Sequence, residues 1–126
     1  RMSFLPVLMV AVGGAAGALA RHALATALRS AVGPGPWPIA VVNVLGCFAF
    51  GLCLALGRGR LPPAAEAGLL VGFLGAFTTF STFAADALQL WTARCYGAFV
   101  SQLLLQNVLG VAAVAGGLAL GAWLRR

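Results

Sequence analysis

Long apolar stretches dominate the chain, and short segments rich in glycine, proline or arginine divide them into four. The predicted helices cover Phe4 to about Leu28, about Trp37 to Leu56, Pro63 to about Trp91, and about Tyr96 to Leu124. Each is near or above the roughly 20 residues that a helix needs to cross a bilayer core. No connection is long enough for a second domain. The pattern therefore predicts that residues 1–126 form a single four-helix transmembrane domain.

Composition supports this interpretation. Hydrophobic residues make up 62% of the chain and charged residues only 8%, whereas soluble domains carry about 25% charged residues. A soluble fold is therefore excluded, and the fold class is an all-α integral membrane protein that crosses the lipid bilayer several times.

The net charge of +6 comes from arginines, and the chain has no lysine. Most of them lie where apolar stretches end: Arg29, Arg58, Arg60, Arg94, Arg125 and Arg126. This placement is typical of interfacial anchors and topology signals. We therefore expect the lipid bilayer as a partner and no nucleic acid.

The arginines are almost evenly divided between the two sides of the membrane. Four spans place both chain ends on one side, with Arg1, Arg58, Arg60, Arg125 and Arg126; the other side has Arg21, Arg29 and Arg94. The positive-inside rule needs a clear excess to fix orientation. The balance favours a chain that inserts both ways round and pairs antiparallel with its own copy. The alternative is a single orientation set by Arg58 and Arg60.

Small residues recur at helical spacing in Gly13-x-x-x-Gly17, Gly68-x-x-x-Gly72 and Gly117-x-x-x-Gly121. Such pairs let helix backbones approach closely in membranes. They predict tight packing in general and no particular interface.

The third predicted helix contains an unusual run, Gly72-Phe-Leu-Gly-Ala-Phe-Thr-Thr-Phe-Ser-Thr-Phe83. Two glycines loosen the helix, and four hydroxyl side chains follow among three phenylalanines. Hydroxyls and irregular backbone at membrane depth are tolerated only where protein or a water-filled cavity covers them. The run therefore predicts a break near Gly75 and a functional site.

Three amide side chains also lie within predicted spans. Asn43 is early in the second helix, and Gln102 and Gln106 share a face of the fourth because they are four residues apart. Each alone is explained by hydrogen bonding between helices. Together with the hydroxyls, they favour a lined pathway.

Carboxylates are missing at mid-depth, since Asp86 lies late in the third helix. Proton-coupled carriers and cation pathways depend on such groups. Amides and hydroxyls donate hydrogen bonds to an anion without adding negative charge, and the edge of a phenyl ring is electropositive. With Arg21, these groups suit a small anion better than a cation. No nucleophile–base pair, metal-ligand set or phosphate-binding loop indicates an enzyme.

These motifs resemble the Fluc/CrcB fluoride channels. The matching segments are Gly13-Gly14-x-x-Gly17-Ala18-x-x-Arg21, Asn43-x-x-Gly46 and the run Gly72–Phe83, in the right order on the first three spans. The resemblance implies a dual-topology antiparallel homodimer with two pores. Its expected activity is passive, electrodiffusive export of cytoplasmic fluoride across a prokaryotic plasma membrane, the inner membrane in a Gram-negative cell.

The resemblance also implies roles for individual residues. Phe80 and Phe83 match pore phenylalanines whose ring edges face the ion, Asn43 matches the pore asparagine, and Ser81 and Thr82 match pore-side hydroxyls. Gly75 and Thr78 match backbone-carbonyl ligands of a structural sodium ion (Na+) on the dimer axis. Arg21 matches an arginine near the pore entrance. Gln102 and Gln106 stand in the pore-lining polar track, where we expect residues such as Tyr and Ser.

Two other classes of protein are considered. A small multidrug-resistance-type exporter also has four spans, but it needs a glutamate in its first span, and Phe4 to Leu28 contains no acid. A non-conducting structural subunit would use its polar residues only to join helices. Replacing Asn43 and the hydroxyls with apolar residues distinguishes these ideas, because only a pore loses flux.

Overall fold

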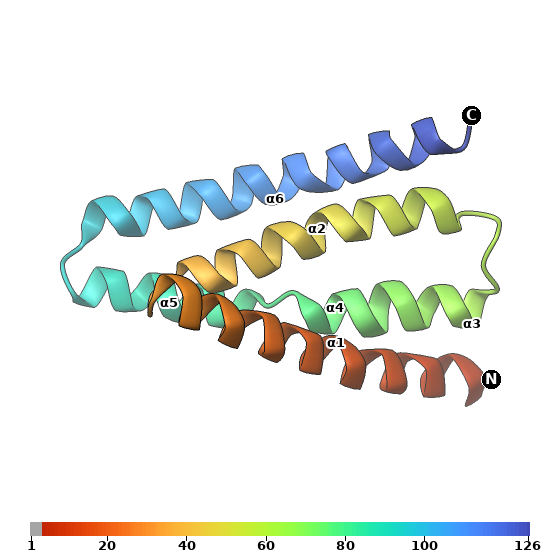
Figure 1. Ribbon diagram of the computed structural model, residues 1–126, viewed down its shortest axis with the longest axis horizontal. Coiled ribbons are helices and arrows are strands. Elements are labelled where there is room, and N and C mark those ends of the chain that lie inside the picture. The colour runs from red at the N-terminus through yellow and green to blue at the C-terminus, as the bar shows by residue number, and fades with distance from the viewer. Residues whose placement is uncertain (1–3) are drawn as a thin grey trace.

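The computed structural model describes residues 4–126, so Arg1 lies outside the described residues. The helical segments are α1 (Phe4–Val32), α2 (Trp37–Gly57), α3 (Pro63–Glu66), η1 (Ala67–Leu74), α4 (Gly75–Phe77), α5 (Phe80–Thr92) and α6 (Tyr96–Leu124). The segments from α3 to α5 follow one another along a single line and form the third span (Figure 1). Within that span, η1 is a π-helical stretch.

Four spans of the described chain are long and apolar enough to cross a membrane: Phe4–Val32, Trp37–Gly57, Pro63–Thr92 and Tyr96–Leu124. This finding confirms the all-α membrane fold class. The spans alternate in direction, so that α1 begins and α6 ends at the same end of the bundle (Figure 1). The first span is longer than predicted, because α1 continues past Leu28 until Gly33 takes a positive φ of 89°.

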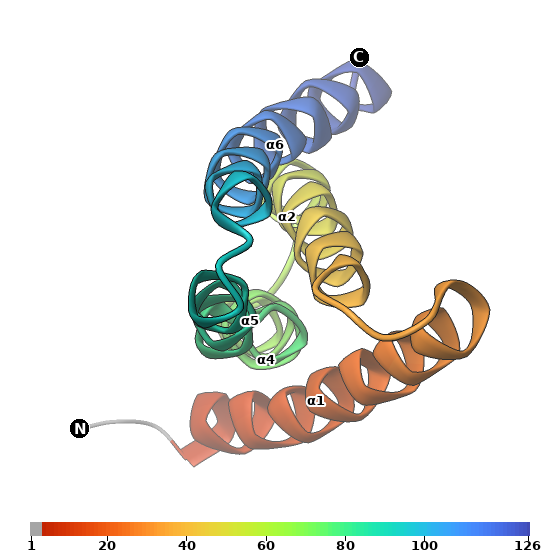
Figure 2. The ribbon, with the colours of Figure 1, turned by 90° about the vertical axis from the view of Figure 1, so that its left-hand side faces the viewer.

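The spans associate in two pairs. α2 packs mainly against α6, and α1 packs mainly against η1 and α4; seen end-on, α1 and α6 lie on opposite sides of the molecule (Figure 2). Glycines lie in both contacts. A Cβ at Gly17 would collide with the carbonyl oxygen of Phe73, and a Cβ at Gly117 with that of Phe48. The predicted close backbone packing therefore occurs, between α1 and η1 and between α2 and α6.

The break in the third span lies close to the predicted position. Gly75 has helical torsion angles, and the chain becomes extended at Thr78 and Thr79, where ψ is 155° and 117°. The third span is therefore broken near its middle, as predicted, within about one helical turn of Gly75. The backbone opens at Thr79 because a side chain from α2 forms hydrogen bonds with it there.

The outer surface of the bundle is strongly apolar. Large hydrophobic side chains are exposed along α1 and α6, among them Phe4, Val12, Leu19, Leu104, Val108 and Val111. An apolar exterior of this kind suits lipid or a second copy of the chain. The predicted homodimer and the single-domain organisation stay predictions.

Candidate functional site

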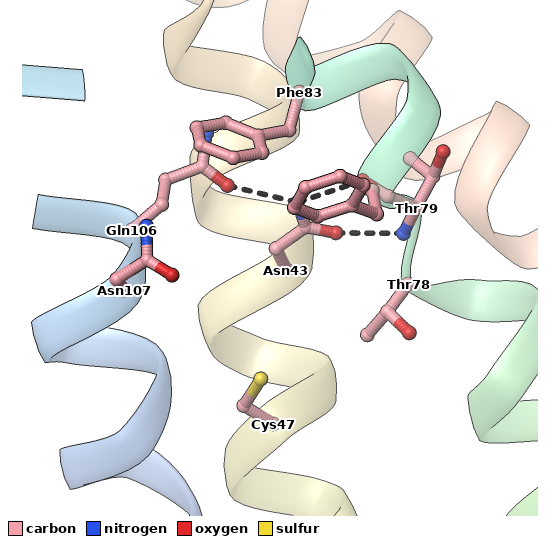
Figure 3. Close-up of a pocket in the computed structure, with 8 residues that line it drawn as sticks. Asn43, Cys47, Thr78, Thr79, Phe83, Gln106 and Asn107 are labelled. Carbon is pink, nitrogen blue, oxygen red and sulfur yellow. Dashed lines mark hydrogen bonds between the residues drawn. The ribbon is translucent and has the colours of Figure 1, made fainter. Parts of the chain in front are cut away.

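A cavity of about 200 Å³ lies at the break in the third span (Figure 3). Its lining comes from α2, from the residues around the break, and from α6. The lining residues are Asn43, Cys47, Thr78, Thr79, Phe80, Phe83, Gln106 and Asn107. The cavity is therefore formed by segments that are far apart in the sequence, and none of its lining side chains is acidic.

Asn43 holds the break in place. Its Oδ1 accepts a hydrogen bond from the backbone N–H of Thr79 at 2.8 Å, and its Nδ2 donates to the carbonyl of Thr79 at 3.1 Å (Figure 3). A buried backbone group needs a partner at membrane depth. The Asn43 amide supplies both partners for Thr79, so the extended backbone is stable where a continuous helix would otherwise form.

Thr79 also begins the next helix. Its side-chain oxygen accepts from the backbone N–H of Thr82 at 3.3 Å, which is the geometry of a helix N-cap. The same hydroxyl lies 3.2 Å from the hydroxyl of Ser81 and 3.1 Å from that of Thr82. Thr79, Ser81 and Thr82 therefore form a hydroxyl cluster at the start of α5.

The amides of α2 and α6 form a chain of hydrogen bonds. Asn43 Nδ2 donates to Gln106 Oε1 at 2.8 Å, and Gln106 Nε2 donates to Gln102 Oε1 at 3.2 Å. Gln102 is only 2% exposed, and its buried Nε2 makes no hydrogen bond. Asn43 and Gln106 thus donate in the same direction along the chain, which ends in the unpaired N–H donor of Gln102.

Gln102 lines a different cavity from Asn43. This second cavity, of about 260 Å³, lies between α2 and α6, and its other lining residues are mostly apolar. Gln106 lines both cavities. The hydrogen-bonded amides therefore extend from the break through Gln106 to Gln102, and their place in the lining of a pore stays a prediction.

Phe80 and Phe83 contact each other edge to face, with ring centroids 5.4 Å apart and an interplanar angle of 63°. Phe83 is 5% exposed and packs in the core with Val42, whereas Phe80 is 75% exposed. Both rings line the polar cavity and also an apolar groove that extends along α5. The rings therefore separate a polar compartment from an apolar one.

The remaining predicted residues lie around this centre. Arg21 and Thr82 line a third cavity, of about 240 Å³, between α1, α2 and α5. Ser81 is exposed and joins the site only through the hydroxyl of Thr79. Thr78 lines the first cavity, while Gly75 lies in the preceding helical turn.

The structure thus places Asn43, Phe80, Phe83 and Gln106 in one cavity and distributes the other predicted residues around it. Sequence reasoning counted Thr79 only among the hydroxyls that favour a lined pathway, and it did not assign Cys47 or Asn107 to the lining. Cys47 was accessible to prediction, because it follows Asn43 by four residues and so shares its helix face. The central position of Thr79 was not, because it depends on the partner that Asn43 provides from another span.

Comparison with known proteins gives consistent results. A family model described as CrcB-like protein, Camphor Resistance (CrcB), matches residues 8–118. A protein of Solidesulfovibrio magneticus named fluoride-specific ion channel FluC is 48% identical over 115 residues, which cover 89% of this chain and 92% of the relative.

Proteins with the same name from Nitrosococcus oceani and Saccharophagus degradans are 43% and 39% identical, covering 83% and 85% of this chain and 86% and 82% of the relatives. All three relatives are bacterial and are named as channels, in agreement with the expectation that the chain is not an enzyme.

Proposed function

The chain belongs to the CrcB-like family, and on this basis we propose that it is a fluoride-selective channel that exports cytoplasmic fluoride by passive electrodiffusion. The observation that carries the proposal is the cavity at the break, where hydrogen-bond donors gather around Asn43 and no lining side chain is acidic. Its place is a prokaryotic plasma membrane, which is the inner membrane if the cell is Gram-negative.

Fluoride is small and strongly hydrated, and burying such a charge without partners costs on the order of tens of kcal/mol. A pore must therefore replace water with donors along the whole path, yet bind weakly enough to release the ion. The Asn43 and Gln106 amides now donate to other amides. Turning one N–H toward the ion exchanges one hydrogen bond for another, so that binding stays weak.

The free Nε2 of Gln102 is the next donor along the path. A buried donor without a partner costs about 1–3 kcal/mol, and a passing anion removes that cost. Phe80 and Phe83 complete the lining by presenting electropositive ring edges. Ser81 and Thr82 contribute through the hydroxyl cluster that they form with Thr79.

A second copy of the chain completes each pore. Phe80 is 75% exposed in the single chain, and an ion beside an exposed ring would face lipid unless another protein surface covered it. The near balance of arginines between the two sides supports an antiparallel arrangement. The result is a dual-topology homodimer with two separate pores.

A structural Na+ fits the break. The N–H of Thr79 bonds to Asn43 instead of the carbonyl of Gly75, and the N–H of Thr82 bonds to Thr79 Oγ1 instead of the carbonyl of Thr78. The carbonyls of Gly75 and Thr78 are therefore released from their helical partners, and hard cations prefer such oxygens. When bound, the ion supplies a fixed positive charge and joins the two halves of the span.

The proposal is tested by fluoride efflux from proteoliposomes, followed with a fluoride electrode after valinomycin releases the potassium counter-charge. We expect rapid fluoride release with negligible chloride release. Phe80→Ile and Phe83→Ile should slow release strongly while the protein stays folded by gel filtration. Phe99→Ile is the matched control, because Phe99 lines the apolar groove but not the polar cavity. Wild-type flux in both pore variants would refute the pore assignment.

The dimer is tested separately by single-cysteine labelling from both sides of the membrane. Dual topology predicts that each position is labelled from both sides in a population of molecules. Labelling of every position from one side only would overturn the antiparallel arrangement.

A further inference from the structure

The second cavity, between α2 and α6, is a long apolar space with amide groups toward one end. Trp37 and Leu45 both line it and are eight residues apart on α2, which is about 12 Å along the helix axis. α2 begins at Trp37, and Gln102 is six residues from the start of α6. Since the two helices run in the same direction (Figure 1), Trp37 and Gln102 lie toward one end of the cavity, and Leu45 and Leu109 toward the other.

Gln102 lies at the boundary of the hydrocarbon core. α6 has 29 residues, about 43 Å in length, so a helix centred on a core of about 30 Å extends about 6 Å beyond it at each end. Gln102 is about 9 Å from the start of the helix, which places it about 3 Å inside the core. Trp37 and Tyr96, which begin α2 and α6, are exposed, and such residues are enriched at the membrane interface. The ester groups of phospholipids occupy this same boundary. The cavity therefore leads from the ester level toward the middle of the bilayer.

The cavity opens on the face of α2 that points away from the break. Val41 and Leu45 are each two residues from Asn43, about 200° around the helix, and both side chains are exposed. In the homodimer proposed above, the partner covers Phe80, which lines the cavity on the Asn43 side. The opposite face is then left to the lipid.

Gln102 needs a hydrogen-bond acceptor that its neighbours do not supply. Its side chain is only 2% exposed, and the buried Nε2 has no partner among residues 4–126. The adjacent Gln106 donates to Gln102 and accepts from Asn43. A buried water needs two to four polar partners, which a mostly apolar lining does not provide. The terminal torsion of glutamine is broad, so a rotation of the amide brings Nε2 to the cavity that this side chain lines.

We propose that the second cavity binds one acyl chain of a bilayer phospholipid, whose ester carbonyl accepts a hydrogen bond from Gln102 Nε2. The apolar walls between Trp37 and Leu45 contact the chain, and the amide selects for the carbonyl at its head. The proposal rests on the proposed dimer, which leaves this face to lipid. An anion that takes the Gln102 donor releases the carbonyl, so lipid binding and conduction share this one group.

The first experiment compares a diester with a diether phospholipid, because an ether linkage lacks the carbonyl. The Trp91→Phe/Trp123→Phe variant keeps Trp37 as its only tryptophan, and its fluorescence is followed in vesicles of diether phosphatidylcholine while a chain-brominated phosphatidylcholine is added as quencher. We expect saturable quenching. The half-maximal mole fraction should be about fivefold lower for the brominated diester than for the brominated diether of the same head group and chains, which is the size of one hydrogen bond.

Gln102→Met tests the amide in the same background. It should reduce the preference for the diester below about twofold while quenching stays saturable, because the apolar walls remain and the donor is lost. An equal affinity for the two lipids before the change, or a full preference after it, would overturn the proposal.

Val44→Phe tests the cavity itself, since it fills the space with a larger side chain. Quenching by either lipid should then rise in proportion to mole fraction, without saturation. Val111→Phe is the matched control, because Val111 is exposed and lies about 180° around α6 from Gln102; it should keep the saturable phase. Saturable quenching that survives in Val44→Phe would place the lipid elsewhere. No quenching of Trp37 by any lipid would mean that a second copy of the chain covers the cavity.

A second measurement uses the wild-type chain and needs no variant to fold. The protein is extracted from vesicles of equal diester and diether phosphatidylcholine, and the lipids that stay bound are counted by native mass spectrometry. We expect about a fivefold excess of the diester. Equal retention would overturn the proposal. Neither measurement depends on fluoride, so a diester preference without fluoride flux would keep the lipid site and refute the channel.

Discussion

The two halves of the third span are built in different ways. The first half, Pro63–Phe77, lies against α1 through glycines at which the backbones nearly touch: Gly68 and Gly72 are buried against Met9 and Val10. The second half, α5, begins with the hydroxyl cluster and carries Phe80 and Phe83. One half is fixed by close packing, and the other depends on hydrogen bonds from a different span.

Within one span, the first half therefore provides stability and the second half provides the polar groups of the site. In a membrane, close backbone contact between small residues holds helices together without polar groups. The first half can therefore anchor the span while the second half presents polar groups to a cavity. Changes in the first half should alter stability without selectivity, and changes at the junction should alter transport first.

The largest effect is expected from Asn43→Leu. The variant removes three hydrogen bonds that Asn43 makes to Thr79 and Gln106, and the loss of about 2.7 kcal/mol from the conducting path corresponds to about a 100-fold fall in flux. Fluoride efflux from proteoliposomes measures it. Asn107→Leu is the control, because Asn107 lines the same cavity but bonds within its own helix to the carbonyl of Leu103. Equal losses in both variants would contradict the special role of Asn43.

A stability effect of the next size is expected in the glycine-packed half. Gly17→Ala places a methyl group against the backbone of Phe73, whereas Gly14→Ala meets only the carbonyl oxygen of Gly72 at 3.9 Å, an ordinary contact. Overpacking of this kind costs about 1–3 kcal/mol. We expect a lower unfolding midpoint for Gly17→Ala alone, measured by thermal denaturation in detergent. The fluoride/chloride selectivity of the surviving protein should be unchanged; a selectivity change would show that the two halves are not separate.

The sequence predicted the spans well because membrane helices are set by length and hydropathy alone. Trp37–Gly57 and Tyr96–Leu124 agree with the predicted ranges within about one residue. The break was predicted near Gly75, within about one helical turn of its position, although the glycine is not its cause. Gly75 stays helical after the π-helical stretch Ala67–Leu74, and the helix opens where Asn43 forms hydrogen bonds with Thr79.

The site was predicted as a set of residue types and not as an arrangement. Asn43, Phe80, Phe83 and Gln106 line one cavity, and that this cavity is part of a pore stays a prediction. That Gln102 belongs to a neighbouring cavity depends on how far α6 is rotated against α2, which a single-helix pattern does not determine. The third cavity combines Arg21 of α1 with Thr82 of α5, and this neighbourhood exists only in the folded bundle.

A smaller effect is expected from Gln102→Met, which keeps the length of the side chain and removes its donor and acceptor. If the free Nε2 of Gln102 serves a passing anion, its loss should lower fluoride flux about tenfold, since one hydrogen bond of about 1.4 kcal/mol is lost from the path. Thermal stability should change little, because two effects offset each other. The variant removes the buried, unpaired Nε2 of Gln102, but it also removes the Oε1 that accepts from Gln106, so that the Nε2 of Gln106 is left unpaired instead. Unchanged flux would show that Gln102 serves only as a contact between helices.

The smallest effect on stability is expected at the junction itself, from Thr79→Val. Valine keeps the shape of threonine, so the extended backbone and its bonds to Asn43 are retained, but the N-cap of α5 and the centre of the hydroxyl cluster are lost. Loss of an N-cap costs about 1 kcal/mol, measured as a lower unfolding midpoint. Ser81→Ala is the control, because the Ser81 hydroxyl is exposed and contacts the cluster only through Thr79; it should leave the midpoint unchanged. A larger loss of stability in Thr79→Val than in Gly17→Ala would mean that the hydrogen-bonded half, and not the glycine-packed half, holds the third span in place.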